Sequence, residues 1–528
     1  TNVTIPNGVT VIVQGSLTVD RTVTVAEGGK LVLDGGSLTV GTVNEDDATK
    51  NVPGKLTVNG EADVTEGTVS MIGGSDENKA TIDSTGSYIY YTNPVSPTVQ
   101  PNGATYTNAD GFTVLTTFSK AVAGAMEADT VNVTVIGTVS DAADVVLGGA
   151  KVTVQGTATL GNIDVTSSTV DVNGGALTAT IVGQTGVDGS TTQSAFQLVG
   201  AEIVGITNTS AVNSQNQTVW SLVFGAVTDG SVTISQGTVS TAADMTGSET
   251  NNSPADSLVV ADGATLTITG DVTISGYKTI TVNGTLDVAA NGGDLEVTVD
   301  GEQKFTVAGT MDVNGVASVN NMVLTGTLNV NETETSTGSM SVSGVLSVGE
   351  ATGTLGATGT VVGDVTLSDT TSYVLAYPGT TVDIASFGNN AKTTQFYING
   401  TLYVTAYTDS DGDVVAIGDN GFMAGVKITG FVTEDSGKTV INDVENWFSD
   451  AALETALVAN NVTTFDIGDA EAAYIQLTPA DAKIQYSVGS GISLYVDGIR
   501  VESGSTPVDI SVGTHTVTAT VNPGYAGE

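Results

Sequence analysis

The feature that most constrains this fold is a short phrase, Gly-x-[Leu/Met/Val]-x-Val, that returns along the chain. It occurs near the N-terminus at Gly15, Gly36 and Gly54, and again at Gly284, Gly309, Gly326 and Gly344. The spacings are 21 and 18 residues in the first set, and 25, 17 and 18 in the second. Three short strands with tight corners take about that many residues, at about 3.3 Å per strand residue. We therefore predict that one repeat is one turn of a coil.

The stretch ATLTITGDVTISGYKTITVNGTLDV, residues 264–288, shows what each turn contains. Its apolar residues come in pairs two apart, which places each pair on one face of a strand. The pairs are Leu266/Ile268, Val272/Ile274, Ile280/Val282 and Leu286/Val288. Gly270, Gly276 and Gly284 stand at the predicted corners. Strands this short form no core alone, so they must stack on strands above and below.

This pattern predicts an all-β protein whose body is a right-handed parallel β-helix, a solenoid that buries a continuous column of Val, Ile and Leu. The variable repeat length favours the right-handed form over the left-handed one, whose hexapeptide repeat is stricter. The alternative is a string of β-sandwich domains, which also have short alternating strands. A phrase repeated at the spacing of one turn favours the solenoid.

Composition agrees with a folded protein of acidic character. The chain has 528 residues, of which 40% are apolar, enough for a sizeable core. Its 57 acidic and 14 basic residues give a formal net charge of -43. Nucleic acid is a poor partner for such a surface, because phosphate binding depends on clustered Lys and Arg. Cations or basic surfaces fit it better.

The absence of cysteine excludes disulfides, thiolate metal sites and thiol catalysis. The chain begins with Thr1, so either a leader has been removed or the sequence is a fragment. No apolar run reaches the length of about 18 residues that a membrane span needs. We expect an exported product without a membrane span in this chain.

Nine Asn-x-Ser/Thr sequons agree with export and raise the possibility of a glycoprotein. They begin at Asn2, Asn132, Asn208, Asn216, Asn251, Asn283, Asn331, Asn399 and Asn461. Many sequons arise by chance in a chain this rich in Thr and Asn.

The chain divides into five predicted parts. Residues 1–93 form the first turns of the β-helix, with the apolar pairs Val3/Ile5, Leu17/Val19, Val23/Val25, Leu31/Leu33 and Leu38/Val40. Residues 94–110, which contain three prolines, form a linker or an excursion from one turn. The main β-helix covers 111–440, a helix and a closing turn cover 441–480, and a small sandwich covers 481–528.

Two short helices interrupt the strands. In FSKAVAGAMEADTVNVTV, the residues Phe118, Val122, Ala125 and Met126 have helical spacing, and Val131, Val133 and Val135 then alternate. In NDVENWFSDAALETAL, Asn442 and Glu445 have capping-box spacing ahead of apolar positions. These helices either cap the ends of the solenoid or lie on the side of a turn.

The C-terminal segment ISLYVDGIRV, then STPVDI, then GTHTVTATVNPGY resembles the PEGA family of small surface-associated β-sandwich modules. The resemblance covers residues 484–525 and rests on Val496-Asp497-Gly498, Thr506-Pro507, Gly513 and Gly524-Tyr525. Ser511-Val512-Gly513 departs from the Pro-Gly turn usual in that family. The resemblance implies a module of bacterial or archaeal envelopes without chemistry of its own. The strand-rich body is similar in pattern to secreted adhesins, surface-layer proteins and archaeal sheath components.

Residues for catalysis are scarce. His515 is the single histidine and lies in a predicted strand without a nucleophile elbow. Arg21 and Arg500, the two arginines, are far apart in sequence, unlike the basic cluster of a lyase for acidic sugars. A glycosidase needs two carboxylates about 5–9.5 Å apart, and no acidic pair stands out. We therefore predict no enzyme activity, and Ca²⁺ is the one cofactor that the sequence suggests.

TDSDGDVVAIGDNG, residues 408–421, is the best candidate for a cation site. Asp409, Asp411, Asp413 and Asp419 offer oxygen ligands of the kind Ca²⁺ prefers. The glycine is at the fourth position rather than the sixth position of an EF-hand loop, and the twelfth residue is Asn420 rather than Glu. A hairpin turn with solvated carboxylates explains the same residues.

The sequence thus favours a structural subunit of an extracellular assembly at the cell surface, such as a surface layer, sheath or filament, built by self-association. The alternatives are an adhesin that binds a polysaccharide or host surface and, less favoured, a β-helical carbohydrate-active enzyme. The expected partners are further copies of the chain and cell-envelope polysaccharide.

Overall fold

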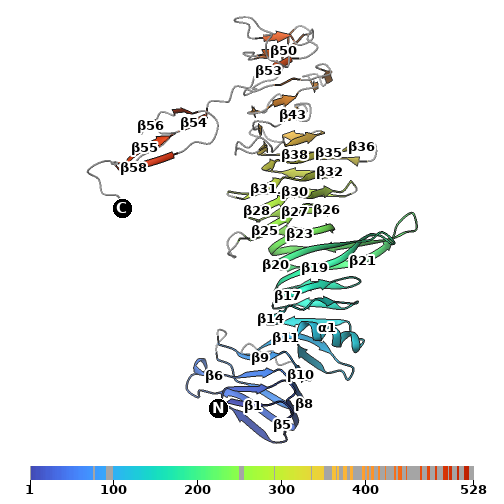
Figure 1. Ribbon diagram of the computed structural model, residues 1–528, viewed down its shortest axis with the longest axis vertical. Coiled ribbons are helices and arrows are strands. Elements are labelled where there is room, and N and C mark those ends of the chain that lie inside the picture. Colours follow the sequence, from blue (N-terminus) through green and yellow to red (C-terminus); the bar gives the residue numbers. More distant parts are fainter. Residues whose placement is uncertain are drawn as a thin grey trace. The chain divides into compact units, whose positions relative to one another are not determined.

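The computed structural model describes residues 2–74, 78–90, 99–248, 255–290, 292–301, 303–333, 336–349, 359–363 and 365–367, and beyond them only short strands between 373 and 521. The chain forms two compact units, Thr1–Lys278 and Thr279–Glu528, which are described one at a time. Figure 1 shows the stacked short strands that make up most of the described chain. Each unit contains a β-solenoid, so the central prediction from the sequence is confirmed.

The first unit begins with a coil that we name the first coil. Its elements are β1 (Asn2–Ile5), β2 (Thr10–Val13), β3 (Ser16–Val19), β4 (Thr22–Val25), β5 (Lys30–Thr42), the 3₁₀ turn η1 (Ala48–Lys50), β6 (Val52–Pro53), β7 (Lys55–Val58), β8 (Glu61–Met71), β9 (Ala80–Ser84) and β10 (Ser87–Tyr90). Strands one turn apart pair in parallel and in register, as β1 does with β4 and β4 with β7.

The core of the first coil is a set of columns of apolar residues, each residue lying over its equivalent one turn earlier. One column runs from Val3 through Val23 and Leu56 to Ile82. The apolar pairs predicted for residues 1–93 all point inward, and Val23, Leu31 and Leu38 are at most 1% exposed. Because directly paired residues share a face of the ladder, register alone places them in one core.

The sheet then continues through two antiparallel strands, β11 (Val99–Thr107) and β12 (Thr113–Thr116). Strand β12 pairs with β10 on one side and β11 on the other, and β11 pairs next with β13 (Asn132–Ile136). Residues 99–107, within the stretch predicted as a linker or an excursion, are therefore part of the solenoid sheet.

At these strands the buried face of the sheet changes sides. Tyr88 is paired with Leu115, Leu115 with Thr105, and Thr105 with Thr134, so these four side chains lie on one face of the sheet. Ile89, Val114, Tyr106 and Val133 lie on the other face. Tyr88 is buried in the first coil, whereas Val133 is buried in the coil that follows. Strand β12 belongs to both cores, because Leu115 is 0% and Val114 3% exposed.

Helix α1 (Phe118–Glu127) packs against β11, β12 and β13. Its buried residues are Phe118, Ala121, Val122 and Ala125, so the predicted helix is confirmed. Thr117 caps the N-terminus, and Asp129, with φ of 57°, ends the helix in the left-handed conformation. Gly124 lies against the Tyr106 ring, on the face that holds Val133. The helix thus covers the start of the second core (Figure 1).

The second coil completes the first unit. Its strands are β13, β14 (Thr138–Asp141), β15 (Val145–Val146), β16 (Lys151–Val154), β17 (Thr157–Asp164), β18 (Thr169–Val172), β19 (Ala176–Val187), β20 (Thr192–Ile203), β21 (Ile206–Val212), β22 (Thr218–Phe224), β23 (Val227–Thr241), β24 (Met245–Thr246), β25 (Ser257–Val260), β26 (Ala264–Ile268) and β27 (Asp271–Ser275). Most pairings are parallel, but β20 inserts antiparallel between β19 and β23, and β21 and β22 form a hairpin that pairs antiparallel with β18 and β19. Phe196 of β20 still pairs with Ile181 and Ile234, so the core continues through it.

The second unit is a solenoid with three strands in each turn. Its first strands are β28 (Thr279–Val282), β29 (Thr285–Val288), β30 (Asp294–Val297), β31 (Lys304–Val307), β32 (Thr310–Val313), β33 (Val316–Val319), β34 (Met322–Leu324), β35 (Thr327–Val330), the hairpin β36 (Glu332–Thr333) and β37 (Ser336–Thr337), β38 (Ser339–Val342), β39 (Val345–Val348), β40 (Thr360–Val362) and β41 (Val365–Leu367). The columns β28–β31–β34, β29–β32–β35 and β30–β33–β38 are all parallel. The handedness of the coil stays a prediction.

Short strands continue along the rest of the second unit. They are β42 (Tyr373–Ala376), β43 (Thr381–Asp383), β44 (Gln395–Ile398), β45 (Thr401–Tyr403), β46 (Ala406–Thr408), β47 (Val414–Ala416), β48 (Phe422–Met423), β49 (Thr433–Asp435), β50 (Lys438–Asn442), β51 (Trp447–Phe448), β52 (Thr464–Asp466), β53 (Ala473–Ile475), β54 (Ala482–Ile484), β55 (Ile492–Val496), β56 (Ile499–Val501), β57 (Val508–Ile510) and β58 (Val517–Val521). Strands β42 to β45 extend two of the parallel columns.

The second predicted helix is not found where the structure describes that segment. Asn442 ends β50, and Trp447 and Phe448 form β51, which pairs with Ile475 and Tyr474. The remainder of 443–463 lies outside the described residues. Aromatic residues favour strands that have a partner, and the capping-box spacing carries no information about that partner. Strands β54 to β58 pair antiparallel, while their assignment as a sandwich stays a prediction.

The repeated phrase marks the corners of the coil, but not always the same corner. Gly284, Gly309 and Gly326 stack one turn apart, with the N–H of Thr310 donating to Gly284 O and that of Thr327 to Gly309 O, both at 2.8 Å. The sequence predicts that Gly344 follows Gly326 in this set. This prediction is wrong, because Gly344 precedes β39, which pairs with β34. The actual successor of Gly326 is Gly359, since the Thr360 N–H donates to Gly326 O.

The same correction applies at the N-terminus. Gly15 and Gly36 stack as predicted, and the Ser37 N–H donates to Gly15 O at 2.8 Å. Gly54 belongs to another corner, because it precedes β7, which pairs with β4. Gly67 lies over Gly36 instead. All corners need a tight bend followed by an inward-facing pair, so one phrase serves several of them.

Gly36 and Gly15 give a matched test of the corner stack. A Cβ at Gly36 would overlap the carbonyl group of Val13, whereas a Cβ at Gly15 meets nothing within 4 Å. We expect Gly36→Ala to destabilise the first unit by about 1–3 kcal/mol, the usual cost of overpacking. Gly15→Ala should leave stability nearly unchanged. Urea unfolding followed by circular dichroism measures both; equal midpoints would contradict the stacking argument.

Candidate functional sites

The first turn of the first coil forms an open end among the described residues. Strands β1, β2 and β3 each have a neighbouring strand on one side only. Of their inward residues, Val3, Val11 and Leu17 are half-buried, whereas Ile5, Val13 and Val19 are at most 8% exposed. The residues stacked on the half-buried three, Val23, Leu31 and Leu38, are at most 1% exposed. We name the side of β1, β2 and β3 that has no paired strand among the described residues the open edge.

Backbone groups along the open edge point away from the coil. In a parallel ladder a strand uses alternate residues to bond one neighbour. The Lys30 N–H donates to Val9 O, so the backbone N–H and C=O groups of Val9, Val11 and Val13 point toward β5. The backbone groups of Thr10 and Ile12 therefore point outward. The same reasoning leaves Asn2, Thr4, Ser16 and Thr18 pointing outward.

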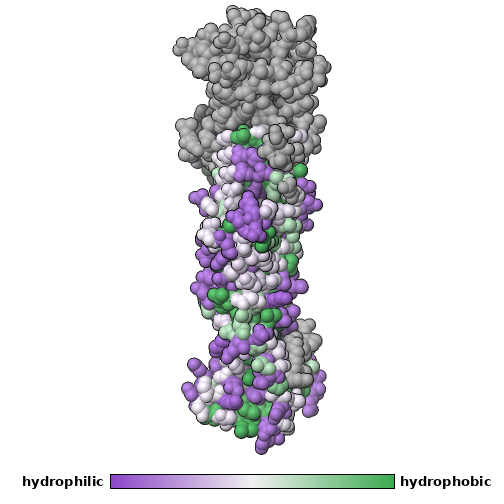
Figure 2. All heavy atoms as spheres, turned by 90° about the vertical axis from the view of Figure 1, so that its right-hand side faces the viewer, coloured by the Kyte–Doolittle hydropathy of each residue, from purple (hydrophilic) through white to green (hydrophobic). Residues whose placement is uncertain are grey.

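Apolar side chains also reach the surface beside this edge. Ile12 is 60% and Val9 41% exposed. Figure 2 shows that on the face it presents, hydrophobic residues form small patches separated by hydrophilic ones. An exposed strand with free donors and acceptors is a template for pairing with another chain, and apolar residues beside it increase that tendency.

The predicted cation ligands Asp409, Asp411, Asp413 and Asp419 lie outside the described residues. The strands on either side of the first three, β46 and β47, are described and pair antiparallel, with Thr408 opposite Val414. His515 also lies outside the described residues. The calcium site stays a prediction.

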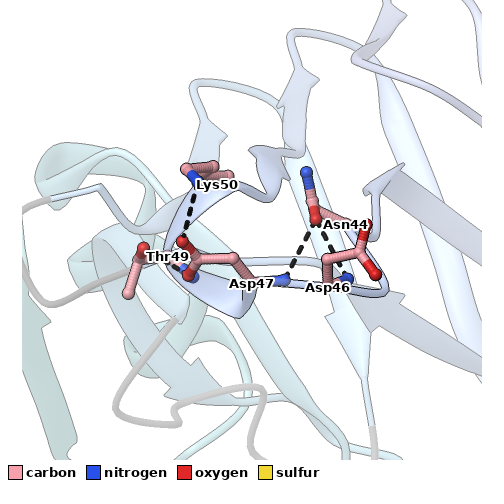
Figure 3. Close-up of polar contacts among 5 residues, drawn as sticks. All are labelled: Asn44, Asp46, Asp47, Thr49 and Lys50. Carbon is pink, nitrogen blue, oxygen red and sulfur yellow. Dashed lines mark hydrogen bonds and ion pairs between the residues drawn. The ribbon is translucent and has the colours of Figure 1, made fainter.

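The described segment richest in carboxylates is the loop around η1, shown in Figure 3. The Asn44 side-chain oxygen accepts from the backbone N–H groups of Asp46 and Asp47 at 3.1 and 3.0 Å. Asp47 accepts from the Thr49 hydroxyl at 2.6 Å and pairs with Lys50 at 3.1 Å, and these contacts lower the pKa of Asp47. The carboxylates of Asp46 and Asp47 point in different directions (Figure 3), so the loop is a capped turn rather than a ligand cage.

A second acidic group lies inside the first unit. Asp256 is 2% exposed, and one of its oxygens accepts from the N–H groups of Gly230 and Ser248 at 2.9 and 2.7 Å. The Asp229 carboxyl is hydrogen-bonded to Asp256, and burial together with this bond raises the pKa of Asp229. Asp229 therefore takes up a proton more readily than an isolated carboxyl does.

Tyr277 lies close to this pair. It is fully buried, and among the described residues its hydroxyl has no hydrogen-bond partner. Burial, with the charges of Asp256 and Asp229, raises the pKa of Tyr277. The ring lies against Gly247, where any larger residue would collide with it.

In the second unit, Asp and Asn side chains form a ladder on the outer face. Asp287 lies beside Asp312, and Asp312 beside Asn329, on successive turns. The Asn314 amide donates to Asp287 at 2.9 Å and the Asn329 amide to Asp312 at 2.7 Å. Partial burial raises the pKa of Asp287, and neighbouring Asp312 adds to the effect. Amide donors thus offset part of the repulsion between neighbouring carboxylates.

The sequons differ in exposure. Asn2, Asn132, Asn216 and Asn283 are exposed. Asn208 is fully buried, and its amide donates to Gln184 O at 2.6 Å and Ser221 O at 2.9 Å. A glycan at Asn208 is incompatible with this packing, so that sequon is corrected to a structural asparagine. Asn251, Asn399 and Asn461 lie outside the described residues.

Other chemical groups are sparse in the part of the chain that the structure describes. There, no three His, Asp or Glu side chains converge closely enough to hold a metal ion. No helix in that part has the length and apolar character of a membrane span.

No protein-family model matches the chain, and no curated protein matches it. The resemblance to PEGA modules therefore rests on the quoted residues alone and stays a prediction.

The carboxyl pair gives a pH test. A carboxyl whose pKa is raised on folding stabilises the fold below its unfolded pKa, about 3.8, and this stabilisation is lost as the pH rises through the folded-state pKa. We expect Asp229→Asn to become progressively more stable than the wild type between pH 4 and pH 7. Urea unfolding at several pH values measures the difference.

Asp110→Asn is the matched control, because it removes one negative charge from an exposed turn. Its stability relative to the wild type should change little with pH. Parallel pH profiles of the wild type and the Asp229→Asn variant would show that folding does not raise the pKa of Asp229.

Proposed function

We propose that the protein is a structural subunit of an extracellular assembly, and that the open edge joins it to a second copy of the chain. The single observation that carries this proposal is the open edge, where β1, β2 and β3 have no paired strand on one side among the described residues and Val3, Val11 and Leu17 are half-buried. A solenoid turn is completed by another turn stacked on it. A second copy supplies strands of the same kind.

Magnitudes indicate what such a contact requires. Full burial of a Val or Leu side chain is worth about 1.5–3 kcal/mol, so three half-buried residues contribute a few kcal/mol at most. Association itself costs at least about 4 kcal/mol in lost translation and rotation. Apolar contact alone is therefore insufficient, and backbone pairing along β1, β2 and β3 has to contribute. The outward N–H and C=O groups of these strands make that pairing available.

Composition supports a place outside the cell. The chain has several exposed sequons, one histidine and two arginines, and most of it is devoted to repeated scaffold. These features favour a surface layer, sheath or filament over an adhesin or an enzyme.

Ile12→Pro tests the role of the backbone edge. Ile12 has an outward-pointing N–H, which proline lacks, and proline is tolerated on edge strands. We expect about a tenfold or greater weakening of self-association, equal to 1.4 kcal/mol or more. Sedimentation velocity over a range of protein concentrations measures it, and electron microscopy of the same samples separates dimers from extended assemblies.

Ile12→Thr is the matched control, since it keeps the N–H and removes only part of the apolar surface. It should weaken association much less than Ile12→Pro. A wild-type chain that stays monomeric at every concentration would overturn the proposal; equal effects of the two variants would assign the contact to side chains rather than backbone.

Salt should strengthen the association. Copies with a net charge of -43 repel each other, and salt screens charges over about 8 Å at physiological ionic strength. Sedimentation at 10, 150 and 500 mM NaCl should therefore show larger species at higher salt. Dissociation with rising salt would indicate that ion pairs, and not edge pairing, hold the copies together.

A further inference from the structure

A groove of about 1000 Å³ lies in the first unit, beside the strands where the buried face of the sheet changes sides. Tyr90, Thr113, Thr105 and Thr134 line part of it, from the adjacent strands β10, β12, β11 and β13. They lie on one face, which is the core face of the first coil and the outer face of the second. The groove is thus a direct product of the change of sides.

The opposite part of the groove is a shelf of stacked glycines, Gly137, Gly156 and Gly175. The Thr157 N–H donates to Gly137 O at 2.8 Å and the Ala176 N–H to Gly156 O at 2.9 Å. A Cβ on Gly156 or Gly175 would overlap the carbonyl oxygen of the preceding glycine. These three turns therefore present about 10 Å of side-chain-free backbone, at about 4.8 Å per turn.

Uncharged hydrogen-bonding groups surround this shelf. Thr113, Thr138 and Thr157 contribute hydroxyls, and Gln100 and Gln155 contribute amides. Each of these groups can both donate and accept hydrogen bonds. Within the described part of the chain, the side chains of Gln100 and Gln155 have no hydrogen-bond partner, so they are available to a ligand.

Charge in the groove is low. Lys79 and Glu202 are the charged residues among its described lining, and a Glu202 oxygen already accepts from the Gly174 N–H at 3.0 Å. The chain as a whole repels polyanions because its net charge is -43. An uncharged ligand with many hydroxyls fits these conditions.

A peptide fits less well. An extended peptide would need a sheet edge with a regular row of donors. Among the strands that line the groove, β11 contributes Val99, Gln100, Pro101 and Thr105, and proline has no N–H to donate. The volume is at the upper end of the range for small-molecule pockets, which suits several linked rings better than one.

We propose that this groove binds a neutral oligosaccharide, with the glycine shelf against the sugar rings and the Thr and Gln side chains bonded to their hydroxyls. This binding site is separate from the open edge and does not depend on self-association.

The test is isothermal titration calorimetry of the full chain with four neutral hexasaccharides, cellohexaose, xylohexaose, mannohexaose and chitohexaose. Hexagalacturonate serves as the acidic comparison. We expect saturable binding of at least one neutral chain at one per protein and no binding of hexagalacturonate. Absence of binding by all four, or equal binding of the acidic chain, would overturn the proposal.

A double variant locates the site. Thr113→Val with Gln155→Ala removes a hydroxyl and an amide from the groove while keeping a β-branched residue in β12. We expect binding to weaken about tenfold or more. The control, Thr159→Val with Gln215→Ala, changes the same residue types at exposed positions outside the groove and should bind as the wild type does. Equal binding by both double variants would place the sugar elsewhere and overturn the proposal.

Discussion

The structure depends on the stacking of one turn on the next, in register. A strand of four residues buries almost nothing alone, and its apolar side chains become buried by stacking on their equivalents in neighbouring turns. Leu17, in the first turn, is half-buried, whereas Leu38, one turn further in, is 0% exposed. Backbone ladders fix the register, and the inward Val, Ile and Leu residues provide the driving force.

The stacking of turns in register also explains why some corners require glycine and why equal side chains form ladders on the outer faces. Turns that stack at about 4.8 Å bring equivalent corners into contact, so a corner such as Gly156 has no room for a side chain. On the outer faces, equal residues lie side by side, which is favourable for Thr pairs and unfavourable for carboxylates. At Asp287 and Asp312, amides from Asn314 and Asn329 offset that repulsion. Because the chain has few Lys residues, amide groups rather than ammonium groups offset the repulsion between these carboxylates.

Where the stacking rule is broken, the molecule gains features that a uniform solenoid lacks. Strand β12 is buried on both faces, with Leu115 in the first core and Val114 covered from the other side, where α1 packs. This switch lets one sheet serve two cores, and it leaves the groove on the face that passes from inside to outside. The antiparallel insertion of β20 has a different result, because its core residues stay on the same side.

The sequence by itself determined the local architecture: which residues face inward, where corners fall, that Phe118 begins a helix, and that the body is a solenoid. It did so because alternation and tight bends are properties of neighbouring residues. Only the tertiary structure decided which corners stack, so that Gly67 and Gly359 follow Gly36 and Gly326 while Gly54 and Gly344 belong elsewhere. It also decided that Trp447 and Phe448 pair as a strand, that Asn208 is buried, and that residues from β10 to β13 line one groove. These outcomes depend on partners far away in sequence, and a local pattern contains no information about which partner a strand will meet.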